Sequence, residues 1–257
     1  MTDTTQKATA LQQLHEAPEI LRVVNVWDAI TTKVVADLPG TKAIATAGHS
    51  IAASLGYEDG GMPLDTALGA LPAIVAATDL PVTADLDDGY AEPGETIRRA
   101  IGLGVVGANV EDRLKPLDES VARVRAIVQA AEAEGVAFQL NARTDAIARG
   151  GDKPHEEKVA DAIERGTAFL AEGASLVFVP GALDRETVSA LVDAFGPQKL
   201  SVIGLPGALT AAEYESLGVA RISYGPLTQR VALRAYRDLA ASLYADGVIP
   251  EDTPALN

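Results

Sequence analysis

Short apolar runs alternate with longer amphipathic stretches along almost the whole chain. The short runs are rich in β-branched residues, which is typical of buried strands. Several of the longer stretches carry apolar residues at positions i, i+3, i+4 and i+7 and end at a glycine, which is typical of helices. We therefore predict eight strands, at residues 22–27, 42–48, 81–87, 107–112, 138–144, 176–181, 200–207 and 220–226.

The order of strands and helices predicts the fold class. Eight predicted helices follow the strands, at residues 28–38, 64–78, 94–104, 119–135, 155–173, 184–195, 210–218 and 227–247. This alternation favours an α/β fold with a parallel sheet. Eight units in 257 residues favour one closed (β/α)8 TIM-type barrel over residues 1–257, with an open doubly wound sheet as the alternative. In a barrel the active site lies at the C-terminal ends of the strands.

Composition and charge restrict the class of partner. The chain is 47% hydrophobic but only 4% aromatic, so its core is aliphatic, and its net charge of −15 disfavours binding to nucleic acid or anionic membranes. It has no cysteine, which excludes disulfides, cysteine nucleophiles and thiolate metal sites. The N-terminus lacks the apolar segment of a signal peptide, and no apolar run reaches the roughly 18 residues of a membrane span. We expect a cytoplasmic protein.

Three carboxylates follow the third predicted strand, in the sequence DLDD at residues 85–88. Side chains alternate along a strand, so Asp85 and Asp87 share a face that we expect to point into the barrel mouth. Such residues can simply cap a helix or face a loop. However, two carboxylates this close repel each other unless a cation joins them, which favours a metal site. Asp88 has the opposite parity and is expected to be exposed or to cap a helix.

The next strand adds a third carboxylate on the same side. In GANVEDR, Glu111 shares a face with Asn109 and ends beside the strand of Asp85 and Asp87. An all-oxygen set of this kind suits Mg²⁺ or Mn²⁺, and Mg²⁺ usually keeps several waters. Asp112 has the opposite parity, so we expect it to pair with an arginine or to cap a helix.

Two further stretches carry candidate groups. Arg143 shares a face with Gln139 and Asn141, where it either neutralises the carboxylates or binds a substrate carboxylate through two parallel hydrogen bonds. The second strand ends in small residues that would let backbone N–H groups approach an anion. His49 and Asp59 follow it, and from the residues alone an ordinary loop or packed position is favoured over a catalytic one for each.

Taken together, the motifs resemble those of the isocitrate lyase / phosphoenolpyruvate mutase superfamily. The matching stretches run in family order over residues 22–226: NVWDAITTKVV, GHSIAASLGYED, DLDDGY, GANVEDR, NARTDA and LGVARISYG. The resemblance implies a barrel whose C-terminal helical segment, residues 227–257, is exchanged between subunits of a homodimer or homotetramer. Its Val231, Leu233, Leu239 and Leu243 would then pack on a neighbouring subunit.

The resemblance also implies roles for site residues. It implies Mg²⁺ near Asp85, Asp87 and Glu111, with Asp87 as the favoured direct ligand, and a 2-oxo acid or its enolate on the metal. The carboxylate of that small substrate would meet the backbone of the second strand and Arg143. The substrate-binding residues predicted in this way are Thr46, Ala47, Gly48, His49, Asp87 and Arg143, and the catalytic residues are Asp59, Glu111 and Arg143.

Departures from the family pattern affect the activity. Isocitrate and methylisocitrate lyases carry a lid loop with a catalytic cysteine, whereas the segment DRLKPLDES after Glu111 is short and has none. The mutase and phosphonopyruvate hydrolase carry a Lys and an Asn in this loop, and only Lys115 is present here. Pro180 stands where the mutase has a histidine, and Ala47 replaces a family serine.

The sequence therefore predicts a Mg²⁺-dependent lyase that cleaves a C–C bond or decarboxylates a small 2-oxo or hydroxy dicarboxylate through an enolate. One alternative is C–P bond chemistry on a phosphonate. A second alternative is a non-catalytic barrel that binds 2-oxo acids. The predicted proton donors, left unranked, are His49, Tyr57, Glu58, Asp59 and Tyr90.

Overall fold

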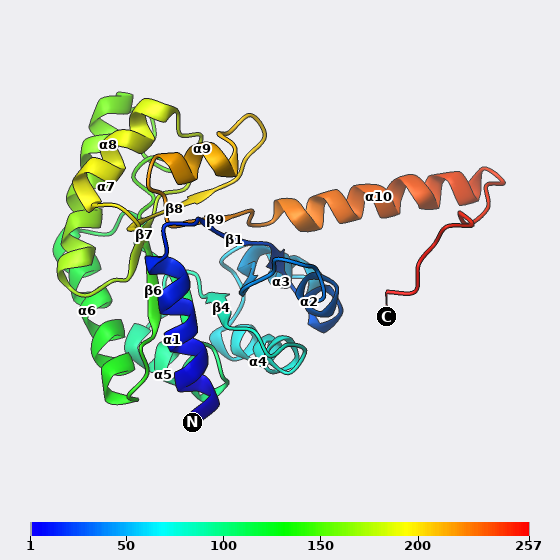
Figure 1. Cartoon of the computed structure of the whole chain (residues 1–257), viewed down its shortest axis with the longest axis horizontal. Coiled ribbons are helices and arrows are strands. Elements are labelled where there is room, and N and C mark those ends of the chain that lie inside the picture. Colours follow the sequence, from blue (N-terminus) through cyan, green and yellow to red (C-terminus); the bar gives the residue numbers. More distant parts are fainter. Residues whose placement is uncertain (1, 257) are drawn as a thin grey trace.

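The strands form a parallel barrel, as predicted. The computed structural model describes residues 2–256 (Figure 1). Its nine described strands pair in the order β1-β9-β8-β7-β6-β5-β4-β3-β2, and every pairing is parallel. Their bounds are Leu21–Val23 (β1), Asn25–Val26 (β2), Ile44–Thr46 (β3), Val82–Asp85 (β4), Gly107–Glu111 (β5), Gln139–Arg143 (β6), Leu176–Phe178 (β7), Leu200–Ile203 (β8) and Arg221–Ser223 (β9).

The first predicted strand is divided into β1 and β2 at Val24. Its first half pairs with β9 and its second half with β3, so this one segment joins the two ends of the sheet. Counted as one strand, it gives the eight strands of a (β/α)8 TIM-type barrel. The prediction of a closed barrel over an open doubly wound sheet is confirmed.

All eight predicted helices are present, and two helices were missed. The missed helices are α1, which precedes the barrel, and α3, seven residues of mostly small side chains directly after β3. The bounds are Thr2–Glu16 (α1), Ala29–Ala36 (α2), Gly48–Ser54 (α3), Leu64–Val75 (α4), Pro93–Gly102 (α5), Leu117–Ala133 (α6), His155–Ala171 (α7), Arg185–Phe195 (α8), Ala211–Ser216 (α9) and Leu227–Tyr244 (α10).

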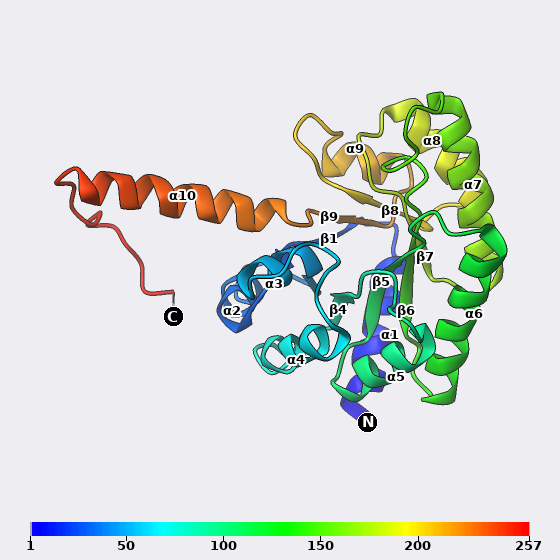
Figure 2. The same cartoon turned by 180° about the vertical axis from the view of Figure 1, so that it is seen from behind.

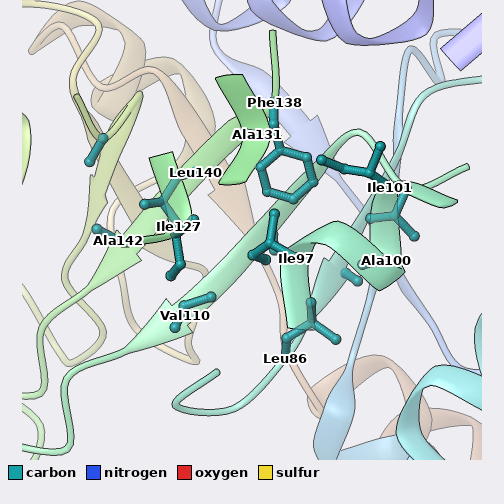
Figure 3. Packing of buried hydrophobic residues seen from close by; sticks show 14 of the residues in the cluster. Leu86, Ile97, Ala100, Ile101, Val110, Ile127, Ala131, Phe138, Leu140 and Ala142 are labelled. Carbon is teal, nitrogen blue, oxygen red and sulfur yellow. The ribbon is translucent and has the colours of Figure 1, made fainter. Parts of the chain in front are cut away.

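The largest apolar cluster fills the space between β4–β6 and the helices α5 and α6 (Figure 3). Leu86, Val110 and Leu140 face outward and pack with Ile97 and Ile127 from the helices. Each fully buried side chain of this size stabilises the fold by about 1.5–3 kcal/mol. Because the apolar residues of these strands face the helices, the alternate residues face the barrel interior, as the strand pattern predicts.

Helix α1 covers the N-terminal end of the barrel. Its Leu11 is fully buried with Leu21 and Val23, and it approaches Gly107 so closely that a Cβ there would lie 3.0 Å from Leu11 Cδ2. His15 Nδ1 also lies 3.2 Å from Gln139 Oε1, at the start of β6. This end of the barrel is therefore closed by the chain itself, and the loops at the opposite end remain available for a site.

Helix α10 leaves the barrel and projects away from it (Figures 1 and 2). Within the described chain, only Gln229 of this helix is buried, whereas Val231 and Tyr236 are each 70% exposed and Leu233 is 56% exposed. Val231, Leu233 and Tyr236 therefore do not pack against their own barrel.

Candidate active site

The loops at the C-terminal ends of the strands enclose a cavity of about 280 Å³. Six residues predicted from the sequence line it together: His49, Asp59, Asp85, Asp87, Glu111 and Arg143. Asn25, Arg113 and Arg149 also line it and were not predicted. The cavity opens at the end of the barrel where active sites of this fold lie.

Asp85, the last residue of β4, is one of the cavity's carboxylates. Its Oδ2 accepts a hydrogen bond from the Gly48 N–H at 2.9 Å, and its own N–H donates to Thr46 Oγ1 at 3.0 Å. Asp85 retains accessible surface where it lines the cavity, but protein atoms enclose the rest of the carboxylate. Burial, with the negative charges of Asp87 and Glu111, raises the pKa of Asp85 to about 6, although Arg143 opposes the rise.

Asp87 reaches the cavity by a different route from the predicted one. The strand ends at Asp85, and Asp87 lies in the following turn with a left-handed φ of 51°. Its carbonyl accepts the Glu111 N–H at 2.8 Å, and its Oδ2 accepts the Tyr90 hydroxyl at 3.2 Å. Burial raises the pKa of Asp87, and burial with the Asp87 charge raises the pKa of Tyr90 above its usual range. Tyr90 therefore stays protonated and donates to Asp87.

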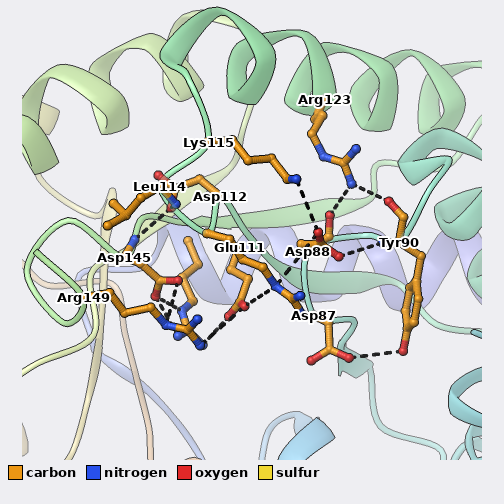
Figure 4. A network of polar contacts seen from close by, with 12 residues as sticks. Asp87, Asp88, Tyr90, Glu111, Asp112, Leu114, Lys115, Arg123, Asp145 and Arg149 are labelled. Atoms are coloured by element: carbon orange, nitrogen blue, oxygen red, sulfur yellow. Dashed lines mark hydrogen bonds and ion pairs between the residues drawn. The ribbon is translucent and has the colours of Figure 1, made fainter. Parts of the chain in front are cut away.

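Glu111 lies at the centre of a group of three guanidinium groups (Figure 4). It is next to Arg143 in the register of β5 and β6, and its Oε2 lies 2.9 Å from Arg143 Nη1. On the other oxygen, Oε1 lies 3.0 Å from Arg113 Nε and 3.8 Å from Arg149 Nη2. Burial raises the pKa of Glu111, while Arg143 acts most strongly to lower it.

Arg143 also pairs with a carboxylate that was not predicted. Asp145 is fully buried, and its Oδ1 accepts from Arg143 Nε at 2.8 Å and from Nη2 at 2.7 Å. Arg143 thus makes the neutralising contacts that the sequence allowed, with Glu111 and Asp145. Its predicted contact with a substrate carboxylate stays a prediction. The NARTD sequence placed Asp145 two residues beyond Arg143, and this same-face spacing was the signal that could have identified it.

At the end of β3, backbone N–H groups lie close to neighbouring strands and donate hydrogen bonds to them. The Ala47 N–H donates to the Val26 carbonyl at 3.0 Å, and the Gly48 N–H donates to Asp85. A Cβ on Gly48 would lie 3.1 Å from Asp85 Oδ2, so glycine permits this contact. Thr46 supports Asp85 through its hydroxyl. Two of the three backbone amides of residues 46–48 already donate within the protein. The predicted contacts of these residues with a substrate stay predictions.

The structure ranks the five predicted proton donors by position. His49 and Asp59 line the cavity, and His49 Nδ1 lies 3.5 Å from Asp59 Oδ1. Tyr57 and Glu58 are exposed and are not among the described residues that line the cavity. Tyr90 contacts the site through Asp87. His49 and Asp59 are therefore the better placed of the five.

The segment after Glu111 is a tight turn, residues 112–116, which leads directly into α6. Asp112 holds it: Oδ1 accepts from the N–H groups of Leu114 and Asp145, each at 3.0 Å, and Oδ2 pairs with Arg165 at 3.1 Å. The expectation that Asp112 pairs with an arginine is confirmed. Asp88 is half-buried, and its Oδ1 accepts from the Tyr90 N–H at 3.2 Å.

Side chains that could hold a metal are present, although no complete cage exists. Within residues 2–256, no group of three or more His, Cys, Asp or Glu side chains is arranged to hold a metal ion. Glu111 is paired with arginines, and Asp59 lies beside His49, which leaves Asp85 and Asp87 as the cavity carboxylates without a basic partner within ion-pair distance among the described residues. Two oxygen-donor groups whose pKa values are raised in a shared cavity fit a hydrated Mg²⁺, which proteins often bind through one or two carboxylates plus substrate.

Comparison with known proteins identifies the family. A family model described as phosphoenolpyruvate phosphomutase matches residues 11–244. The chain belongs to this family. The resemblance to the isocitrate lyase / phosphoenolpyruvate mutase superfamily is thereby confirmed, and with it the class of enzyme, since members of this superfamily are lyases and mutases of that type.

Several relatives of this phosphomutase-family chain have assigned names. A solved structure of a candidate phosphonomutase from Burkholderia cenocepacia J2315 has 38% identity and a TM-score of 0.86, covering 95% of this chain and 100% of that one. The 2,3-dimethylmalate lyase of Eubacterium barkeri is 27% identical over 93% of this chain and 86% of its own. An oxaloacetate decarboxylase of Paraburkholderia xenovorans (strain LB400) is 29% identical over 91% and 81%.

One further finding concerns membranes. Among the helices of residues 2–256, none has both the length and the apolar character that a membrane span requires.

Proposed function

We propose that this protein is a Mg²⁺-dependent lyase that breaks a C–C bond, by cleavage or decarboxylation, in a small 2-oxo or hydroxy dicarboxylate through an enolate. The observation that carries the proposal is the placement of Asp85 and Asp87 beside Arg143 in one cavity at the C-terminal end of the barrel. Relatives named 2,3-dimethylmalate lyase and oxaloacetate decarboxylase support this class of substrate.

The roles of the carboxylates follow from their surroundings. Asp85 and Asp87 would hold the metal, which when bound would supply positive charge opposite the developing enolate oxygen. Hydrogen bonds from Gly48 to Asp85 and from Tyr90 to Asp87 fix the directions of the two carboxylates. Such fixed donors limit reorganisation during the reaction, because each carboxylate is held before the substrate arrives.

Arg143 would orient the substrate carboxylate. Its guanidinium is held from one side by Asp145 and from another by Glu111, at 2.7–2.9 Å. Binding a substrate would require Arg143 to share or exchange one of these contacts, and Glu111 is the partner that lines the cavity. Glu111 therefore acts as a positioning residue for Arg143.

We assign proton transfer to two further groups that line the cavity. The chain has no cysteine, and the turn at residues 112–116 contributes no lid, so the acid used by the lid-bearing lyases is absent. His49 and Asp59 lie together at the cavity wall, and we assign proton delivery to this pair.

Chemistry at a C–P bond is the second candidate function. It is favoured by the 38% identity with the candidate phosphonomutase. Against it, the loop of residues 112–116 offers only Lys115 of the residues that the mutase type uses there.

We also propose that the protein forms a homo-oligomer. The exposed apolar residues of α10 would pack on a neighbouring copy, which gives a homodimer or homotetramer. An apolar surface of this kind on a projecting helix is costly in water and marks an interaction site.

Turnover of a substrate panel tests the proposal. The protein would be incubated, in Mg²⁺ or in a chelator, with each of four compounds: oxaloacetate, 2,3-dimethylmalate, 2-methylisocitrate and phosphonopyruvate. NMR would follow the products. We expect Mg²⁺-dependent loss of at least one dicarboxylate. Turnover of phosphonopyruvate alone would support the second candidate, and binding without any turnover would support a non-catalytic barrel.

A further inference from the structure

Two arginines at the cavity mouth have no part in the proposed reaction. Arg113 and Arg149 line the same cavity as Arg143, and both approach one atom, Glu111 Oε1, at 3.0 and 3.8 Å. They come from different loops, after β5 and after β6. Their side chains are 35% and 50% exposed, so both remain accessible to a small molecule.

The loops that carry this pair are tied together. Asp112, next to Arg113, accepts the Asp145 N–H, and the Arg149 N–H in turn donates to the Asp145 carbonyl at 2.7 Å. Gly150 then packs so tightly that a Cβ would lie 2.3 Å from the Ala146 carbonyl oxygen. The backbones of the two loops that carry the arginines are therefore held relative to each other.

The conformation of Arg113 is strained. Its φ is 46°, and that of Leu114 is 54°, a left-handed conformation that side-chain-bearing residues rarely adopt. Such backbone strain tends to persist at functional sites. The turn directs Arg113 over Gly60, where a Cβ would lie 3.0 Å from Arg113 Nη2.

Few carboxylates form direct ion pairs with these arginines. Arg113, Arg143 and Arg149 share two carboxylates, Glu111 and Asp145, within 3.8 Å. The next carboxylate, that of Asp88, is 3.9 Å from Arg113 and also 3.9 Å from Lys115. Asp87 also acts electrostatically on Arg113, and Asp85 on Arg143. The three guanidinium groups are nevertheless the positively charged side chains described at this cavity, so an anion that enters it would bind at them.

We propose that Arg113 and Arg149 bind the second carboxylate of a dicarboxylate substrate. This inference rests on the proposed function, which places the first carboxylate and its neighbouring oxygen at Arg143 and the Asp85–Asp87 pair. The cavity of about 280 Å³ suits a compact substrate whose two acidic groups lie a few bonds apart. Two guanidinium groups from neighbouring loops suit a planar carboxylate with two oxygens.

Binding of malate and lactate tests the subsite, since the two differ mainly by one carboxylate. Each is titrated calorimetrically into the full-length protein in Mg²⁺ buffer, and NMR verifies that neither is consumed. We expect wild-type protein to bind malate more tightly than lactate. Arg149→Gln and Arg113→Gln should each weaken malate binding about 10-fold and lactate binding less than about threefold, in line with the loss of a charged hydrogen bond.

Arg125→Gln is the matched control. Arg125 is 53% exposed and pairs with Glu172 away from the cavity, so this variant should bind both ligands as the wild type does. Equal loss of malate and lactate affinity in Arg149→Gln, or no preference for malate in the wild type, would overturn the inference. A preference for phosphonopyruvate over oxaloacetate that depends on Arg149 would overturn the assignment of this subsite to a carboxylate. Because these titrations require no turnover, they can fail or succeed independently of the substrate panel.

Discussion

Replacing Asp85 with asparagine should stabilise the metal-free protein at neutral pH. Burial, together with the charge of Asp87, raises the pKa of Asp85 from its usual 3.8 to about 6. The folded chain then binds more protons than the unfolded chain between about pH 4 and 6, so stability falls as the pH rises through this window. A pKa shift of one unit corresponds to about 1.4 kcal/mol. Above about pH 6, the ionised Asp85 carboxylate therefore destabilises the fold by roughly 3 kcal/mol.

Asparagine removes this penalty and keeps the local contact, because its carbonyl oxygen can still accept the Gly48 N–H. We therefore expect Asp85→Asn to raise the free energy of unfolding by up to about 3 kcal/mol at pH 7.5 in chelating buffer. At pH 5 the wild-type group is mostly protonated, and the advantage should shrink by roughly 1.4 kcal/mol. Added Mg²⁺ should stabilise the wild type more than the variant, because the variant lacks one of the two carboxylates.

Urea denaturation at both pH values measures these differences. Asp152→Asn is the matched control, since Asp152 is an exposed carboxylate outside the cavity and its removal changes the net charge equally. An Asp85→Asn protein that is no more stable than the wild type at pH 7.5, or whose advantage is the same at pH 5, would refute the argument.

Three further predictions follow from the site and from α10. Asp87→Ala should abolish Mg²⁺-dependent turnover with an unchanged circular dichroism spectrum, and full activity in chelator would end the metal hypothesis. Arg143→Lys keeps the charge but loses the bidentate geometry, so kcat/KM should fall roughly 10- to 150-fold; unchanged kinetics with altered Mg²⁺ affinity would leave Arg143 as a neutralising group only. Light scattering should give a dimer or tetramer that Val231→Glu shifts toward monomer, whereas a wild-type monomer at micromolar concentration would contradict subunit exchange.

The barrel could be predicted because its signals are local. All eight predicted strands and all eight predicted helices are present, since each apolar run is bounded by a change of periodicity. Strand parity correctly placed Asp85, Glu111 and Arg143 on the cavity side. Helix α1 escaped prediction because the few residues that it buries, such as Ala8 and Leu11, make a weak periodic signal. Helix α3 is too short to show one.

The contacts within the site depended on tertiary structure and were less predictable. Asp87 was assigned to a strand, but it reaches the cavity from a left-handed turn that parity cannot describe. Arg113 and Arg149 lie in loops, and their approach to Glu111 depends on contacts across those loops. The pairing of Glu111 with three arginines likewise changes its predicted role from metal ligand to positioning residue in the proposed mechanism.

Hydrogen–deuterium exchange at the methyl group of pyruvate tests the enolate proposal most directly. Exchange at this carbon in D2O requires removal of a methyl proton to form the enolate but no C–C bond cleavage, so it does not depend on knowing the substrate. We predict NMR-detected exchange that requires both the protein and Mg²⁺ and is lost in Asp87→Ala. Exchange no faster than in protein-free buffer, at saturating pyruvate and Mg²⁺, would contradict the account.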